Sequence, residues 1–151
     1  MKTILAAVDF SPVSARVVEE AATLARALHA RLVLATVLIE PVYLKEFAPP
    51  PPRVAQITVA HARAVRARLA ALQTTLRARS IPTTVVVRCG QPAVELLAEA
   101  AERNPAYLVI GSHGHTAFYD LLLGSTAQTI LKRAQRPVVV ISSVAQKSGR
   151  K

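Results

Sequence analysis

Three of the chain's five glycines lie in one stretch, GSHGHTAFYDLLLGST, which begins at Gly111. Gly114 follows three residues later, and Gly124 stands after nine more residues, directly before Ser125 and Thr126. Glycine allows a backbone to approach a ligand closely. A helix that begins here would present unpaired amide hydrogens and two hydroxyl groups. Because helix N-termini favour anions, the spacing predicts a phosphate-binding loop built mostly from backbone amides.

This glycine loop matches neither of two common phosphate-binding motifs. The chain contains no GxxxxGK[ST] sequence and the loop has no lysine, which excludes a Walker A loop. The GxGxxG fingerprint of dinucleotide-binding folds is also absent from the loop. A glycine turn followed by a Ser or Thr helix cap would produce the same residues without any ligand, and this alternative stays open.

Other side chains that could do chemistry have less specific patterns. His113 and His115 lie inside the glycine loop without nearby Cys or carboxylate ligands, so we interpret them as loop or phosphate contacts rather than zinc ligands. Any Mg²⁺ would be held by nucleotide phosphates rather than by a protein cage. Asp9 follows an apolar run and could contact a ligand, cap the next helix or accept a local hydrogen bond. The single Cys89, with no partner histidine indicated, is interpreted as a small apolar residue at a strand end.

The glycine loop lies within a regular alternation of apolar runs and helical patterns. The apolar runs predict strands at residues 3–8, 31–38, 83–88, 106–111 and 137–142. The helical spacing predicts helices at residues 11–30, 54–79, 92–103 and 125–135. This order predicts a single-domain α/β fold, a doubly wound parallel sheet with helices on both faces. Ligands bind such sheets beyond the carboxyl ends of the strands, where Asp9 and the glycine loop are expected.

Two helices carry further expectations. In the helix at 92–103, Val94, Leu97 and Ala101 are expected to face the core. The helix at 54–79 follows four consecutive prolines, which predict an extended surface loop. Its basic residues are expected outside, and its apolar positions recur at helical spacing at Val54, Ile57, Val65, Leu69, Leu72 and Leu76. The domain is expected to span residues 1–144, with a polar basic tail at 145–151.

Composition limits the class of protein. The chain has 151 residues, of which 52% are hydrophobic, enough for one domain with a full core. No apolar run is long enough to span a membrane, and Asp9 interrupts the N-terminal run too early for a signal peptide. With a single cysteine, these features predict a soluble cytoplasmic protein.

The formal net charge of +10 is unevenly distributed. No acidic residue occurs between Glu46 and Glu95, a stretch that carries seven arginines. Such a balance can attract nucleic acid, anionic lipid or phosphate ligands. Because no known nucleic-acid-binding motif accompanies the charge, we favour a solvated basic helix over nucleic-acid binding.

The longer pattern, G-x2-G-x9-G-[ST] between a buried strand and a helix, resembles the signature of the universal stress protein family. The segment YLVIGSHGHTAFYDLLLGSTAQTILKRAQRPVVVI is similar to the C-terminal part of that family. ILAAVDFS is similar to its first strand, LVLATVLIE to its second, and CGQPAVELLAEA to its third loop and helix. The resemblance covers nearly the whole chain. It implies a five-stranded Rossmann-like sheet of order 3-2-1-4-5, as in adenine nucleotide α-hydrolases, which reverses between strands 1 and 4.

The resemblance also implies a site, because family members with the glycine motif generally bind ATP and this chain keeps every motif position. By resemblance, the loop amides and Ser125 hold the phosphates, with Thr126 adjacent, and Asp9 contacts the ribose side of the nucleoside. The backbone of Val37 meets the adenine edge and Ala7 lies beside the base, although from its own sequence context Val37 would be a core valine. The candidate site comprises Ala7, Asp9, Val37, Gly111, His113, Gly114, His115, Gly124, Ser125 and Thr126.

The function implied is that of an ATP-binding regulatory protein of the stress response, acting on a protein partner that the sequence does not identify. One alternative is a slow ATPase or nucleotidyl-transfer enzyme at the same site, although the loop offers no Lys or Arg to stabilise a phosphoryl-transfer transition state. Another is a polyanion-binding protein that uses the basic helix at 54–79. The family's usual dimerisation, with an apolar last strand at an edge, implies a homodimer through residues 137–142.

Overall fold

A computed structural model of the chain describes residues 1–39, 49–113 and 123–142. Within them the strands are β1 (Thr3–Ala7), β2 (Arg31–Leu38), β3 (Thr83–Cys89), β4 (Tyr107–Gly111) and β5 (Val138–Ile141). The helices are α1 (Ser14–Ala27), α3 (Pro52–Ala78), α4 (Pro92–Arg103) and α5 (Ser125–Arg133). The expected tail at 145–151 and most of the loop before the prolines lie outside the described residues.

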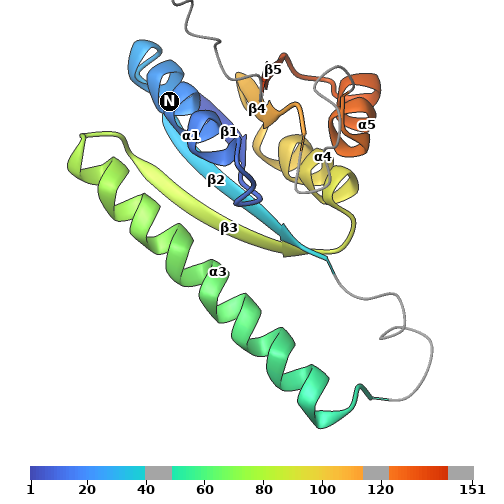
Figure 1. The fold of residues 1–151 in the computed structure, drawn as a ribbon. Helices are drawn as coiled ribbons and strands as arrows, with labels where there is room; N and C mark the ends of the chain where they lie inside the picture. Colours follow the sequence, from blue (N-terminus) through green and yellow to red (C-terminus); the bar gives the residue numbers. More distant parts are fainter. Residues whose placement is uncertain (40–48, 114–122, 143–151) are drawn as a thin grey trace, which may run out of the picture.

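The strands form one parallel sheet of order β3-β2-β1-β4-β5, which confirms the predicted fold class and strand order. Figure 1 shows the helices on both sides of this sheet. One face packs against α1 and α3 through a core that includes Ile4, Val17 and Leu69. The other packs against α4 and α5 through a core that includes Leu5 and Ile130. Successive residues of β1 therefore pack into the cores on opposite faces of the sheet, as the two-residue period of a strand requires.

Two helices begin at different residues from those expected. The first predicted helix was to begin at Ser11, but α1 begins at Ser14, because the backbone at 11–13 forms a turn organised by Asp9. Helix α3 begins at Pro52, the last of the four prolines. Proline fits the first turn of a helix because its missing N–H would have no partner there.

Helix α4 is rotated relative to the apolar pattern from which its buried face was predicted. Its buried residues are Leu96, Glu99 and Ala100, whereas Val94 is 46% exposed and Ala101 is also exposed. The expectation that Val94 and Ala101 face the core was therefore wrong. Glu99 is only 2% exposed, because its carboxylate is paired, which makes burial tolerable.

Helix α3 contacts the sheet over only part of its length. Its buried residues are Val65, Leu69 and Leu76, all in the C-terminal half. In the N-terminal half, Ile57 is 63% exposed and Val59 is 58% exposed, so the expectation that Ile57 packs in the core was wrong. Figure 1 shows this end of α3 standing away from the sheet.

Candidate functional site

The carboxyl ends of β1 and β4 lie side by side at the point where the strand order reverses. Ala6 pairs with Val109 across the two strands, so Asp9 and Gly111 emerge from the same edge of the sheet. The end of β1 is also tied to β2 by two hydrogen bonds. The Val8 amide donates to the Ala35 carbonyl at 2.8 Å, and the buried Thr36 hydroxyl donates to the Val8 carbonyl at 2.7 Å. Asp9 and the start of the glycine loop therefore lie at one edge of the sheet, as expected from the strand ends that precede them.

Asp9 organises the turn between β1 and α1. Its Oδ1 accepts a hydrogen bond from the Ser11 amide at 2.9 Å and another from the Ser14 hydroxyl at 2.8 Å. Ser14 is the first residue of α1, so the carboxylate stands at the N-terminus of that helix, where negative charge is favourable. Asp9 does not cap α1, because the N-cap residue is Val13 and no side chain caps the helix amides; its role within the chain is to accept the local hydrogen bonds from Ser11 and Ser14. The residue is also exposed at the sheet edge, so this role is compatible with contact to a ligand.

Side-chain packing around Gly111 leaves no room for a Cβ atom. A Cβ built at this position would lie 2.5 Å from Cγ1 of Val13 and 3.3 Å from the His113 carbonyl oxygen. Val13 immediately precedes α1 and is buried, so it has little room to move. The absence of a side chain at Gly111 therefore allows the turn after β1 to pack against the end of β4. This packing role is additional to the room for a ligand that was expected at Gly111.

The two described ends of the glycine loop are held together. The Gly124 amide donates to the Ser112 carbonyl at 2.8 Å, and the Ser112 amide donates to the Ile141 carbonyl at 2.8 Å. This brings the start of α5 to the carboxyl ends of β4 and β5. Ser112 was not singled out from the sequence, because a serine after a strand has no distinguishing pattern.

The N-terminus of α5 is not capped by a side chain. Gly124 is the N-cap residue, with φ −61° and ψ 157°, and the first turn contains no acidic residue. Within the described residues, no hydrogen bond satisfies the amide hydrogens of Ser125 and Thr126. The Ser125 side chain is exposed and Thr126 is half-buried. The start of α5 therefore offers amide donors and hydroxyl groups in the arrangement that binds anions.

Ala7 and Val37 lie on the sheet face covered by α4 and α5. Both are half-buried and pack against the core of that face. Ala7 pairs with Ala35 of β2, two residues before Val37, so the two side chains are on neighbouring strands near the same edge. They are thus on the side of the sheet from which α5 begins. Ala7 and Val37 therefore lie on the sheet face that α5 covers, and Ser125 is the first residue of that helix.

The histidines are only partly within the described chain. The Ser112 hydroxyl and Nδ1 of His113 are 2.9 Å apart, in a hydrogen bond that orients the imidazole at the end of β4. Gly114 and His115 lie outside the described residues. Over residues 1–39, 49–113 and 123–142, no group of three or more His, Cys, Asp or Glu side chains is placed to hold a metal ion. Cys89 ends β3 as expected, but it is exposed rather than packed as a small apolar residue.

A charged cluster joins the end of β3 to α4, and its Arg88 is in register with Val37 of β2. Arg88 donates to Glu95 at 2.8 Å and to the buried Glu99 at 2.6 Å, and Arg103 also pairs with Glu99. Burial by itself would raise the pKa of Glu99, but the hydrogen bonds from Arg103 and Arg88 outweigh it and hold the pKa below its ordinary value. Every acid in the cluster has an arginine partner, so its role is to join α4 to the sheet.

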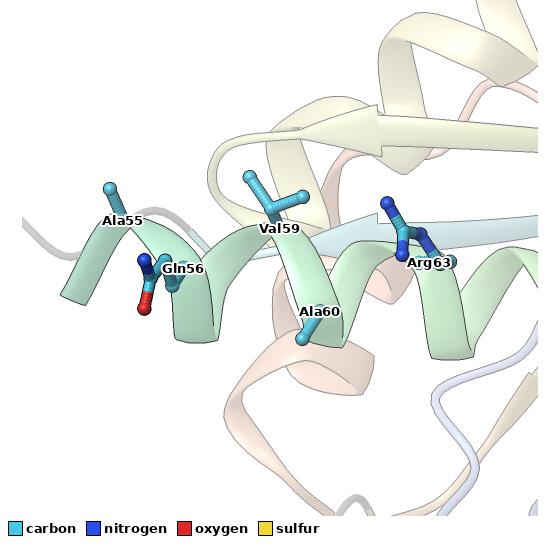
Figure 2. A pocket seen from close by; sticks show the side chains of 5 residues that line it. All are labelled: Ala55, Gln56, Val59, Ala60 and Arg63. Carbon is cyan, nitrogen blue, oxygen red and sulfur yellow. The ribbon is translucent and has the colours of Figure 1, made fainter. Parts of the chain in front are cut away.

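A shallow depression lies on the projecting half of α3. Figure 2 shows the residues that line it, and all of them belong to this one helix: Ala55, Gln56, Val59, Ala60 and Arg63. None of the residues that line the depression belongs to the candidate site. Among the helices of the described chain, none combines the length and apolar character needed to cross a bilayer.

Comparison with solved structures supports the fold. The structure of MJ0577 superposes with a TM-score of 0.77 at 19% identity, covering 96% of this chain and 98% of that one. The universal stress protein UspA from Lactobacillus plantarum superposes with a TM-score of 0.79 at 20% identity, over 93% of this chain and 97% of that one. A universal stress protein in complex with cAMP superposes with a TM-score of 0.64 at 21% identity, over 95% and 98% of the two chains.

Sequence comparison identifies the family. The universal stress protein MJ0577 of Methanocaldococcus jannaschii is 30% identical over 56 residues, which is 37% of this chain. The matched stretches span only 35% to 20% of the length of the curated relatives. The family model described as "Universal stress protein family" matches residues 1–142, most of the chain. The chain belongs to the universal stress protein family.

Proposed function

We propose that this protein binds ATP at the carboxyl edge of its sheet, between the turn after β1 and the start of α5. The observation that carries the proposal is the uncapped N-terminus of α5, joined by the Gly124–Ser112 hydrogen bond to the end of β4. Unpaired helix amides at this position suit a phosphate group. Asp9 lies on the neighbouring strand end, where a ribose hydroxyl could donate to its carboxylate.

Each part of the nucleotide has candidate contacts in this arrangement. The phosphates are assigned to the glycine loop, to the amides at the start of α5 and to the hydroxyls of Ser125 and Thr126. Mg²⁺ would accompany the phosphates. The base is assigned to the edge of Val37 and Ala7, on the same sheet face as α5. Family membership and the cAMP complex of a structural relative support an adenine nucleotide as the ligand class.

Titration calorimetry with ATP and Mg²⁺ tests the proposal. We expect wild-type protein to bind and Gly114→Val to lose binding, because a side chain there obstructs the phosphates. Asp9→Asn and Ser125→Ala are each expected to weaken binding by about tenfold, the loss of one hydrogen bond to a charged group. Glu20→Gln is the matched control for Asp9→Asn, because it removes an exposed acid on α1 away from the edge. Absence of binding to the wild-type protein would refute the proposal.

We infer that the protein acts by binding rather than by turnover. Phosphoryl transfer needs cationic groups that stabilise the developing charge, and the loop from Gly111 to Thr126 contains no Lys or Arg. A bound nucleotide can regulate a protein partner only if it binds two conformations with different affinity. Slow ATP hydrolysis remains the alternative at the same site. A turnover rate well above background that is lost in Asp9→Asn would favour it.

Polyanion binding through α3 is a second candidate function. Arg53, Arg63 and Arg66 are exposed on this helix, and the helix contains no acid. Association with DNA that weakens steeply as salt increases would favour this candidate. The calorimetric result for ATP is independent of it, because the arginines lie outside the proposed nucleotide site.

A further inference from the structure

The residue that follows Asp9 has an unusual backbone conformation. Phe10 has φ 57°, in the left-handed region that large L-residues seldom adopt. A disfavoured conformation persists only where surrounding contacts hold it. Phe10 separates Asp9 from Ser11, whose amide donates to the Asp9 carboxylate at 2.9 Å. The conformation of Phe10 therefore decides whether the Ser11 amide can reach Asp9.

Two contacts hold the Phe10 ring. The ring is half-buried and packs against the core on the α1 and α3 face of the sheet. Its exposed side is covered by Arg68, whose guanidinium carbon lies 4.0 Å from the ring centroid. A cation at this distance over an aromatic face is attracted by the quadrupole of the ring. The Phe10–Arg68 contact thus links the turn after β1 to a helix that is distant in sequence.

Arg68 is well placed to act as a fixed support. It belongs to the half of α3 that packs on the sheet, and its neighbour Leu69 is fully buried. Within the described residues, no carboxylate forms a salt bridge with Arg68, and its guanidinium lies over the aromatic ring. By contrast, Arg79, the residue that follows α3, forms a salt bridge with Glu19 of α1.

We propose that Arg68 is a positioning residue for the nucleotide site. Through Phe10 it keeps the turn after β1 in the conformation in which Asp9 accepts from Ser11 and Ser14 and stands at the sheet edge. Arg68 itself does not contact the nucleotide. The inference rests on the proposed function, since it assigns to Asp9 a role in holding ATP.

Arg68→Ala and Arg66→Ala form a matched pair of variants. Each variant replaces one exposed arginine of α3 by alanine, so the two change the net charge and the helix propensity equally. We expect Arg68→Ala to raise the Kd for ATP by about two- to fivefold, while Arg66→Ala leaves it unchanged within error. Arg68→Lys should recover most of the affinity, because an ammonium group can also lie over the ring. Equal Kd values for the two alanine variants would overturn the inference.

The Asp9→Asn background tests whether Arg68 acts through Asp9. If it does, Arg68→Ala has little further effect on the Kd once the carboxylate is gone. A full additional loss would mean that Arg68 contacts ATP directly or attracts it by charge, and would also overturn the inference. The double variant Phe10→Leu/Arg68→Ala should bind ATP no more weakly than Phe10→Leu alone. Each substitution removes the same contact, that of Arg68 with the Phe10 ring.

Amide hydrogen exchange measures the positioning without any nucleotide. The Ser11 amide is held by the Asp9 carboxylate. We expect it to exchange about tenfold faster in Arg68→Ala than in wild type, and to be unchanged in Arg66→Ala. If the wild-type protein binds no ATP, the proposed function fails, and the exchange rate of Ser11 alone decides whether Arg68 holds the turn. Unchanged exchange in Arg68→Ala would refute the positioning role.

Discussion

At the scale of single residues, Gly111 shows that one glycine can satisfy two requirements. A Cβ at this position would lie 2.5 Å from Val13 Cγ1, far inside normal contact distance. Val13 belongs to the same connection as Asp9, so this packing brings the turn after β1 against the end of β4. A variant of Gly111 therefore tests packing as well as ligand binding.

Gly111→Ala is expected to lower the free energy of unfolding by about 1–3 kcal/mol, the usual cost of overpacking a well-packed region. Chemical denaturation measures the change. Adding Val13→Ala should recover part of the loss, because it removes the methyl group that the new Cβ would meet. Strictly additive effects of the two substitutions would show that Gly111 is needed for a different reason.

At the scale of secondary-structure elements, the cluster of Arg88, Arg103 and Glu99 determines which face of α4 is buried. Glu99 is 2% exposed, and its two arginine partners come from β3 and from the next turn of α4. Removing one member of such a buried cluster leaves uncompensated charge, which is costly. Paired charge therefore occupies a position that the pattern of apolar residues would have assigned to the surface.

Glu99→Gln is expected to reduce stability at pH 7 by about 1–3 kcal/mol, the value of hydrogen bonds to a charged group. The pKa of Glu99 is lowered in the folded protein from an ordinary value of 4.5. The ionised Glu99 therefore contributes its full share of the free energy of unfolding above pH 4.5, and this share is lost as the pH falls through the folded pKa.

Urea denaturation at several pH values should then show the stabilities of wild type and Glu99→Gln converging as the pH falls below about 4.5. Glu102→Gln is the control, because Glu102 is 64% exposed and its pairing with Arg88 is 3.3 Å long. It should change stability by less than about 1 kcal/mol. A constant difference between wild type and Glu99→Gln across the pH range would contradict the assignment.

At the scale of the whole molecule, the sheet has an open edge at β5. This strand is last in the sheet order, and its residues from Val138 to Val140 are only half-buried. The carbonyls of Pro137 and Ile141 accept hydrogen bonds from the amides of Leu108 and Ser112, in and just after β4. By the two-residue period of a strand, Val138 and Val140 direct their backbone groups away from the sheet. Those groups could pair with the same strand of a second copy, the homodimer expected from the sequence.

Val140→Pro tests this dimer, because it removes an outward amide hydrogen while keeping the hydrogen bonds to β4. Proline is tolerated on edge strands where the missing N–H would face solvent. We expect sedimentation analysis to show a shift from dimer to monomer, with the fold retained by circular dichroism. Val139→Pro is the control, since it removes an inward bond and should destabilise the fold instead. An unchanged dimer mass in Val140→Pro would exclude this strand as the interface.

Most of the fold could be predicted from local patterns. Apolar runs identified the five strands, and helical spacing identified α1, α3, α4 and α5. The alternation of strands and helices predicted the parallel sheet, while the order of its strands came from the family resemblance. The spaced glycines and Asp9 indicated which edge to examine, because the carboxyl ends of parallel strands emerge together.

The tertiary structure alone decided which distant residues meet. The contact of Arg68 with Phe10, the packing of Val13 against Gly111 and the pairing of Arg88 with Glu99 each join separate elements. Periodicity describes one element at a time, so it could neither foresee these contacts nor show that Glu99 is buried. The helical spacing also could not show that Ile57 is exposed, because an apolar residue on a helix is buried only where another element packs against that face.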